Sequence, residues 1–99
     1  MNFIVSEKSS THGLLLVITD ADIVGKSFEE DKLQLDLSID FYKGEIKSKE
    51  EIKELVPKAR HIHLTGKEAV AIGIELNLVD VNIILYVQGI PHAEAFIEN

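Results

Sequence analysis

The stretch RHIHLTGKEAVAIGIELN, residues 60–77, decides the fold, because its polar and apolar residues change from a period of two to a nearly helical one. Residues 60–64 alternate and predict a strand. The pattern Thr-x-x-Glu at residues 65–68 is a capping box, which predicts a helix from there to about Asn77. This helix is apolar nearly all round, so we expect it to be buried. Gly73 inside it costs about 1 kcal/mol relative to alanine, a cost that a close packing contact would explain.

The segment that follows this helix predicts how the strands are connected. Residues 83–87 are an apolar run and predict a second buried strand. A strand, a helix and a further strand in succession join parallel strands through a right-handed crossover. We therefore expect the strands around Ile62 and Ile84 to be parallel neighbours.

Further elements are expected on the N-terminal side. Residues 32–37 alternate strictly and predict a half-buried strand. Residues 48–51 form a second capping box, which begins a helix. Pro57 either ends this helix early or lies in its last turn. Residues 20–25 predict one helical turn, with Asp20 as its N-cap and a glycine as its C-cap.

The two ends of the chain predict an antiparallel hairpin and a pairing surface. Residues 3–5 and 13–18 are apolar strands separated by turn chemistry, and residues 93–97 predict a last short strand. We expect residues 3–5 or residues 95–97 to lie at a sheet edge, which is a pairing hazard. This predicts a symmetric homodimer through one edge or through the exposed face of the second helix.

Together these patterns predict an α/β fold: a single domain over residues 1–99, with a mixed β-sheet, an N-terminal antiparallel hairpin and two helices. A chain of 99 residues leaves no room for a second core. The apolar fraction of 45% and the charged fraction of 27% exclude a disordered or fibrous protein.

Composition also excludes several functions. The absence of cysteine excludes disulfides, thiolate zinc sites and cysteine nucleophiles. No targeting signal or membrane segment is recognisable, so we expect a cytoplasmic protein with no membrane partner. Thirteen isoleucines with a single methionine are typical of thermophiles.

Charge is distributed unevenly along the chain. The net charge is -7, yet residues 43–67 carry +3 and the remainder carries -10. A basic segment on an acidic body is typical of a protein that docks an anionic surface in one orientation, although a solvated helix face explains it as well. Tyr42 beside Phe41 adds a candidate stacking surface. The basic residues of the segment that matter most here are Lys43, Lys53, Lys58, Arg60 and Lys67.

Two groups of histidines are candidate chemical sites. His61 and His63 lie on one face of a strand, where a third ligand from His92 or Glu94 would complete a metal site. The alternative is that the two histidines are simply the solvent-facing residues of an alternating strand. His92 follows the stiff turn formed by Gly89 and Pro91, so it is either a general base or ligand contact, or a structural histidine.

Two segments resemble the end of a phosphate-binding loop but do not match its full motif. Gly25-Lys26-Ser27 lacks the upstream glycine, because that position is Asp20, and Gly66-Lys67 is followed by an acid. The helix N-terminus at Gly66 and Lys67 is then either a generic anion site or a plain cap.

Four short motifs, at residues 24–28, 41–44, 64–70 and 89–94, occur in an order that resembles the small archaeal family known as domain of unknown function 424. The Gly-x-Pro-His-Ala turn and the Phe-Tyr-x-Gly step are the most specific parts. The resemblance covers nearly the whole chain and implies no known activity. His61 and His63 are outside the resembling pattern, which counts against the metal hypothesis. The positions that the resemblance marks are Gly25, Lys26, Phe41, Tyr42, Gly44, Gly66, Gly89, Pro91 and His92.

Two functional hypotheses follow. The first is a non-enzymatic binding module, with no cofactor, that contacts RNA or a ribonucleoprotein through residues 43–67. The alternative is a small-molecule or metal-dependent enzyme centred on His92, which requires Lys26 or Lys67 to converge with it in one pocket.

Overall fold

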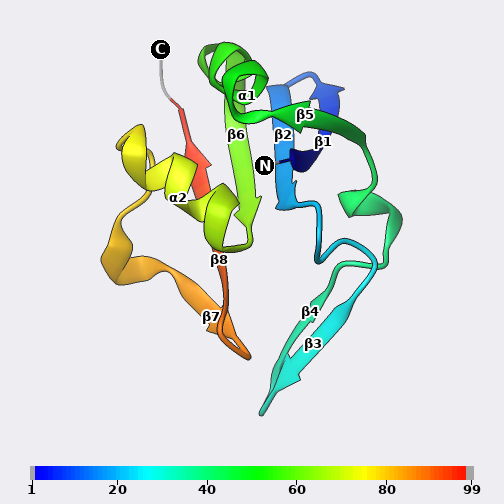
Figure 1. Cartoon of the computed structure of the whole chain (residues 1–99). Coiled ribbons are helices and arrows are strands. Elements are labelled where there is room, and N and C mark those ends of the chain that lie inside the picture. The colour runs from blue at the N-terminus through cyan, green and yellow to red at the C-terminus, as the bar shows by residue number, and fades with distance from the viewer. Residues whose placement is uncertain (1, 98–99) are drawn as a thin grey trace.

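The computed structural model describes residues 2–97, which form eight strands, two α-helices and three short 3-10 turns (Figure 1). The helices are α1 (Lys49–Leu55) and α2 (Lys67–Glu75). The 3-10 turns are η1 (Asp40–Tyr42), η2 (Val56–Lys58) and η3 (Val81–Ile83). The strands are β1 (Asn2–Ser10), β2 (Gly13–Asp20), β3 (Ser27–Glu30), β4 (Leu33–Asp36), β5 (Glu45–Ser48), β6 (Ala59–Thr65), β7 (Leu85–Val87) and β8 (Ile90–Phe96).

Six strands form one mixed sheet in the order β5-β1-β2-β6-β8-β7, and β3 and β4 form a separate two-stranded ribbon. β2 and β6 are parallel, and the other neighbours are antiparallel. The mixed sheet, the N-terminal hairpin of β1 and β2 and the two helices confirm the fold class that the sequence predicts.

Both helices lie on one face of the sheet (Figure 1). Apolar side chains from alternate strand positions pack against them there. Gly73 of α2 faces Leu64 and Val79 so closely that a Cβ atom would collide with both, which confirms the packing contact expected there. The helix-covered core consists of Phe3, Val5, Leu16, Ile18, Ile52, Val56, Ala59, Ile62, Leu64, Ala69, Val70, Ile72 and Ala93.

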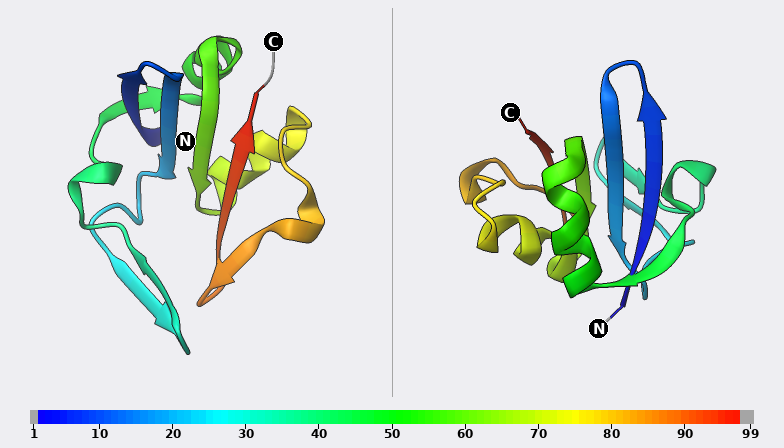
Figure 2. Two further views of the ribbon diagram at one scale, coloured as in Figure 1. Left: turned by 180° about the vertical axis from the view of Figure 1, so that it is seen from behind. Right: turned by 90° about the horizontal axis from the view of Figure 1, so that it is seen from above.

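The opposite face carries no helix, and the β3–β4 ribbon and η1 cover part of it (Figure 2, left). Its smaller apolar cluster includes Val17, Leu35 and Tyr42. The tip of the ribbon reaches the β7–β8 turn, where the backbone N–H of Gln88 donates to the Glu30 carboxylate at 2.6 Å. This arrangement leaves the part of the face that β6 and β8 supply only partly covered.

Residues 83–87 differ from the sequence prediction. Only Leu85–Val87 form a strand, and Ile83 and Tyr86 are 71% and 54% exposed, so this is not a buried strand. β7 pairs with β8 and not with β6. The expected parallel pairing of the Ile62 and Ile84 strands is therefore wrong: β8 turns back through a hairpin and takes the place beside β6, in the antiparallel sense.

The start of α2 also differs from the prediction. Thr65 ends β6 and its side chain does not cap the helix, whose N-cap is Gly66. The Asp20 carboxylate caps α2 instead, from the end of the neighbouring strand β2. Residues 21–25 are hydrogen-bonded turns, so Asp20 does not begin a helical turn of its own. The capping box at Ser48 and Glu51 is present as predicted.

The sheet edges are β5 and β7. Neither chain end forms an edge strand: residues 3–5 lie between β2 and β5, and β8 lies between β6 and β7. Residues 93–96 of β8 pair with β6 alone, so one side of this stretch is open. In the ribbon, Leu33 is 40% exposed while Leu35 and Leu37 are buried, so two of its three leucines reach the core. No helix within residues 2–97 has the length and apolar character to cross a membrane.

Candidate functional site

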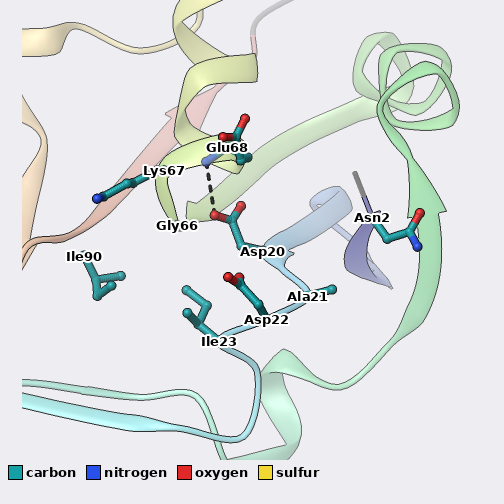
Figure 3. A pocket seen from close by; sticks show the side chains of 9 residues that line it. All are labelled: Asn2, Asp20, Ala21, Asp22, Ile23, Gly66, Lys67, Glu68 and Ile90. Carbon is teal, nitrogen blue, oxygen red and sulfur yellow. Dashed lines mark hydrogen bonds between the residues drawn. The ribbon is translucent and has the colours of Figure 1, made fainter.

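A cavity of about 470 Å³ lies where the parallel strands β2 and β6 end and α2 begins (Figure 3). In sheets with parallel strands, ligands commonly bind in the crevice outside the carboxyl ends of those strands. The sequence gives no direct sign of this pocket beyond an aspartate after a buried strand. It is lined by Asn2, Asp20, Ala21, Asp22, Ile23, Gly66, Lys67, Glu68 and Ile90.

Asp20 is buried at the floor of this pocket and holds the start of α2. Its carboxylate accepts the backbone N–H groups of Glu68 and Ala69, at 3.1 and 2.7 Å. Burial raises the pKa of Asp20 above its ordinary value, and these two hydrogen bonds oppose the rise. Gly66 allows this approach: its φ is +108°, and a Cβ atom there would collide with Asp20. The carboxylate thus occupies the place that an anion would take at the helix N-terminus.

The remaining charges of the pocket favour a cationic group. Asp22 and Glu68 are exposed, and neither forms an ion pair with any residue of the described chain. Lys67 extends away from the two aspartates, towards Ile90 (Figure 3). Three carboxylates against one ammonium leave an excess of negative charge beside apolar walls.

Four of the sequence-predicted site residues meet beside this pocket. The backbone N–H of Gly66 donates to the Pro91 carbonyl at 2.9 Å, which joins the start of α2 to β8. Lys67 separates the pocket from a second hollow of about 290 Å³, which Gly89, Pro91 and Tyr86 also line. The turn at Gly89 and Pro91 and the start of α2 at Gly66 and Lys67, which are far apart in the sequence, therefore form one region of the molecule.

His92 does not belong to this region. Its side chain lies on the helix-free face, where its Nδ1 atom is 2.7 Å from the Thr65 hydroxyl, and burial lowers its pKa below the ordinary value. It lines neither hollow beside Lys67, and Lys26 is exposed at the start of the ribbon. The convergence that an enzyme centred on His92 requires is therefore absent from the described residues.

The basic residues of segment 43–67 do not form one surface. Lys49 and Lys53 of α1 both pair with Glu75 of α2, at 2.9 and 2.5 Å, and Lys43 pairs with Asp40 at 2.9 Å.

Lys58 and Arg60 are exposed at the start of β6, at the opposite end of that strand from Lys67. Tyr42 is only 9% exposed and packs in the smaller core, so its ring is not available for stacking on a base.

A second candidate site lies on the helix-free face, where β6 and β8 pair. His61 Nε2 is 3.4 Å from Glu94 Oε2, and His63 Nδ1 is 3.5 Å from Glu94 Oε1. Both nitrogens are buried and have no hydrogen-bond partner among residues 2–97, a condition that typically costs about 1–3 kcal/mol each. Burial lowers the pKa of His63, which favours the neutral imidazole.

The rings of Phe41 and Phe96 flank these histidines. Phe96 stacks on His61 with centroids 4.2 Å apart, and Phe41 meets His63 edge-on at 5.3 Å. The sequence places His61 and His63 on one face and names two candidates for a third ligand. The register of β8 against β6 selects Glu94, opposite His63, and leaves His92 opposite Thr65.

Comparisons with known proteins identify a family and a fold. A family model described as a protein of unknown function, DUF424, matches residues 7–97. The crystal structure of an uncharacterised conserved protein from Methanopyrus kandleri is similar, with a TM-score of 0.79 and 20% identity. The similarity covers 98% of this chain and 92% of that one, and at this identity it shows the fold alone. No curated protein matches the sequence.

Proposed function

This chain belongs to the DUF424 family, and we propose that it is a cytoplasmic binding module whose pocket beside the start of α2 takes a small molecule with a protonated amine. The observation that carries the proposal is the lining of the pocket at the ends of β2 and β6. The carboxylates of Asp22 and Glu68 are unpaired among the described residues, beside the apolar side chains of Ile23 and Ile90.

The geometry supports this ligand class over an anion. The helix N-terminus, which normally attracts an anion, already receives the Asp20 carboxylate. A cationic amine would meet Asp22 and Glu68 at the mouth of the pocket while its carbon chain lies against the apolar wall. Such an arrangement, with few polar groups fixing a mostly apolar ligand, is common in small-molecule sites.

Calorimetric titration with spermidine at low salt tests the proposal, with inorganic phosphate as the anionic probe. We expect spermidine to bind with one equivalent and phosphate not to bind. Asp22→Asn should weaken spermidine binding by about tenfold, the lower end for losing a charge-assisted hydrogen bond.

Asp31→Asn is the matched control. Asp31 is exposed in the β3–β4 turn, outside the pocket, and has a positive φ that asparagine tolerates. Equal weakening by both substitutions would mean that spermidine responds only to the net charge of -7, and the pocket proposal would be wrong.

RNA binding is the second candidate function, and the exposure of Lys58 and Arg60 favours it. Neither side chain forms an ion pair with a described residue. Fluorescence anisotropy with structured and single-stranded RNA at two salt concentrations tests it. Binding should weaken as salt rises and should be lost in the Lys58→Glu, Arg60→Glu double variant but not in Lys32→Glu. Absence of binding at low salt, or equal binding by all variants, excludes this candidate.

A further inference from the structure

The helix-free face carries a cluster of side chains that the pocket does not use: His61 and His63 of β6 and Glu94 of β8. We propose that these three residues bind a divalent transition-metal ion of the zinc class. The proposal is independent of the amine pocket, which lies at the end of the strands and shares no residue with this cluster.

The pairing of β6 with β8 positions the three ligands. Residues two apart on a strand point to the same face, so His61 and His63 project side by side. In the antiparallel register, Glu94 lies directly opposite His63, and its two carboxylate oxygens reach the two rings separately. Rigid strands therefore supply all three groups, and no loop has to move to bring them together.

Two of the ligand spacings match a metal site, and the set of three is slightly wider than one. Bonds of about 2.0–2.2 Å in a tetrahedral zinc site place neighbouring ligand atoms about 3.4 Å apart. The two contacts between Glu94 and the histidine rings measure 3.4 and 3.5 Å. One ligand atom from each of the three residues lies within 4.8 Å of the others, so a shift of about 1 Å closes the site.

The two nitrogens that face Glu94 are not used by any hydrogen bond within residues 2–97. In the described part of the chain His61 Nε2 and His63 Nδ1 are buried without a hydrogen-bond partner, whereas the Nδ1 of His92 lies within hydrogen-bond distance of the Thr65 hydroxyl. Buried polar atoms usually have a partner, and an unsatisfied one points to an ion or water at that place. Imidazole nitrogens and a carboxylate are among the ligands that zinc prefers.

The described residues supply three ligands, which is the number found in open zinc sites with a fourth position for water or another molecule. Phe41 and Phe96 form apolar walls on either side, which hold the two imidazole rings in place. Glu94 is 45% exposed, so the ion can enter from solvent on this side.

Titration of untagged, chelator-treated protein with Zn(II) tests the proposal, with Co(II) as a spectroscopic probe. We expect one equivalent to bind, with Co(II) absorption in the visible range. The ring nitrogen resonances of His61 and His63 should shift on Zn(II) binding, while those of His12, exposed in the β1–β2 turn, should stay unchanged.

His63→Gln and Glu94→Gln should each weaken Zn(II) binding by at least the 10–100-fold that losing a supporting outer group typically costs. His12→Gln is the matched control and should bind like the natural chain. Two results would overturn the proposal: no Zn(II) or Co(II) binding at micromolar protein, or full binding by both His63→Gln and Glu94→Gln. Circular dichroism of each variant establishes that it is folded, and either variant alone suffices if the other does not fold.

Discussion

The two faces of the six-stranded sheet differ in chemistry although they alternate along the same strands. On β6, Ile62 and Leu64 point to the helices and are at most 1% exposed, whereas His61 and His63 point the other way. The helix-covered face is apolar and closely packed. The helix-free face has buried polar atoms, including the Thr19 hydroxyl, that lack hydrogen-bond partners among the residues that the structure describes. The comparison indicates that the helix-covered face holds the larger apolar core, whereas the helix-free face combines a smaller apolar cluster with buried polar groups.

The largest effect is expected on the helix-covered face. Ile62→Ala should lower the free energy of unfolding by about 2–5 kcal/mol, because it leaves a cavity under both helices. Urea unfolding followed by circular dichroism measures the loss. A loss below about 1 kcal/mol would mean that the helices do not depend on this contact.

A smaller effect is expected where α2 is attached to the sheet. Asp20→Ala should cost about 1–2 kcal/mol, because the N–H groups of Glu68 and Ala69 lose their acceptor. Hydrogen exchange of these two amides should also accelerate. Unchanged hydrogen exchange of these amides would contradict this prediction and would mean that water replaces the carboxylate with no loss of stability.

On the helix-free face, His63→Leu should change the stability of metal-free protein by less than about 1 kcal/mol. The substitution removes apolar contacts of the ring, but it also removes a buried nitrogen without a partner. The same urea titration in the presence of a chelator gives the value. A loss as large as that of Ile62→Ala would show that the two faces contribute equally to the fold.

The ion pairs that join α1 to α2 should have a small, pH-dependent effect. Lys53 and Lys49 hold the pKa of Glu75 at about 2, below its ordinary value. A lowered acid pKa stabilises the fold above the ordinary value of 4.5 and loses that contribution as the pH falls through about 2. The thermal midpoint of Glu75→Gln should lie slightly below that of the natural chain at pH 7, and the difference should vanish near pH 2. If the difference in thermal midpoint persists at pH 2, the ionised Glu75 carboxylate is not its cause.

The smallest expected effect is weak self-association through the β7 edge. Leu85 and Tyr86 are about half exposed there, so a symmetric dimer should form at high concentration. Light scattering coupled to size exclusion in 0.15 M salt measures the mass. Leu85→Lys should reduce association, whereas Ile46→Lys on the β5 edge should not. A mass of one chain that is unchanged at tenfold higher concentration would contradict this prediction.

Local patterns in the sequence were sufficient for the elements whose signal is local. The alternation of residues 60–64, the capping box at Ser48 and the hairpin of residues 3–18 each depend on neighbours within a few positions. The run at residues 83–87 misled because apolar character alone does not distinguish a buried strand from an exposed edge. The Thr-x-x-Glu pattern misled because Asp20, distant in sequence, caps α2 instead.

The sequence by itself determined the mixed α/β class, the two helices and the shared face of His61 and His63, because strand and helix periods follow from backbone geometry. Only the tertiary structure decided that β2 and β6 are the parallel pair, that Asp20 meets the start of α2, and that Glu94 faces the histidines. The physical reason is register: a shift of β8 by one residue would turn Glu94 to the opposite face, and the packing of the whole sheet fixes that choice.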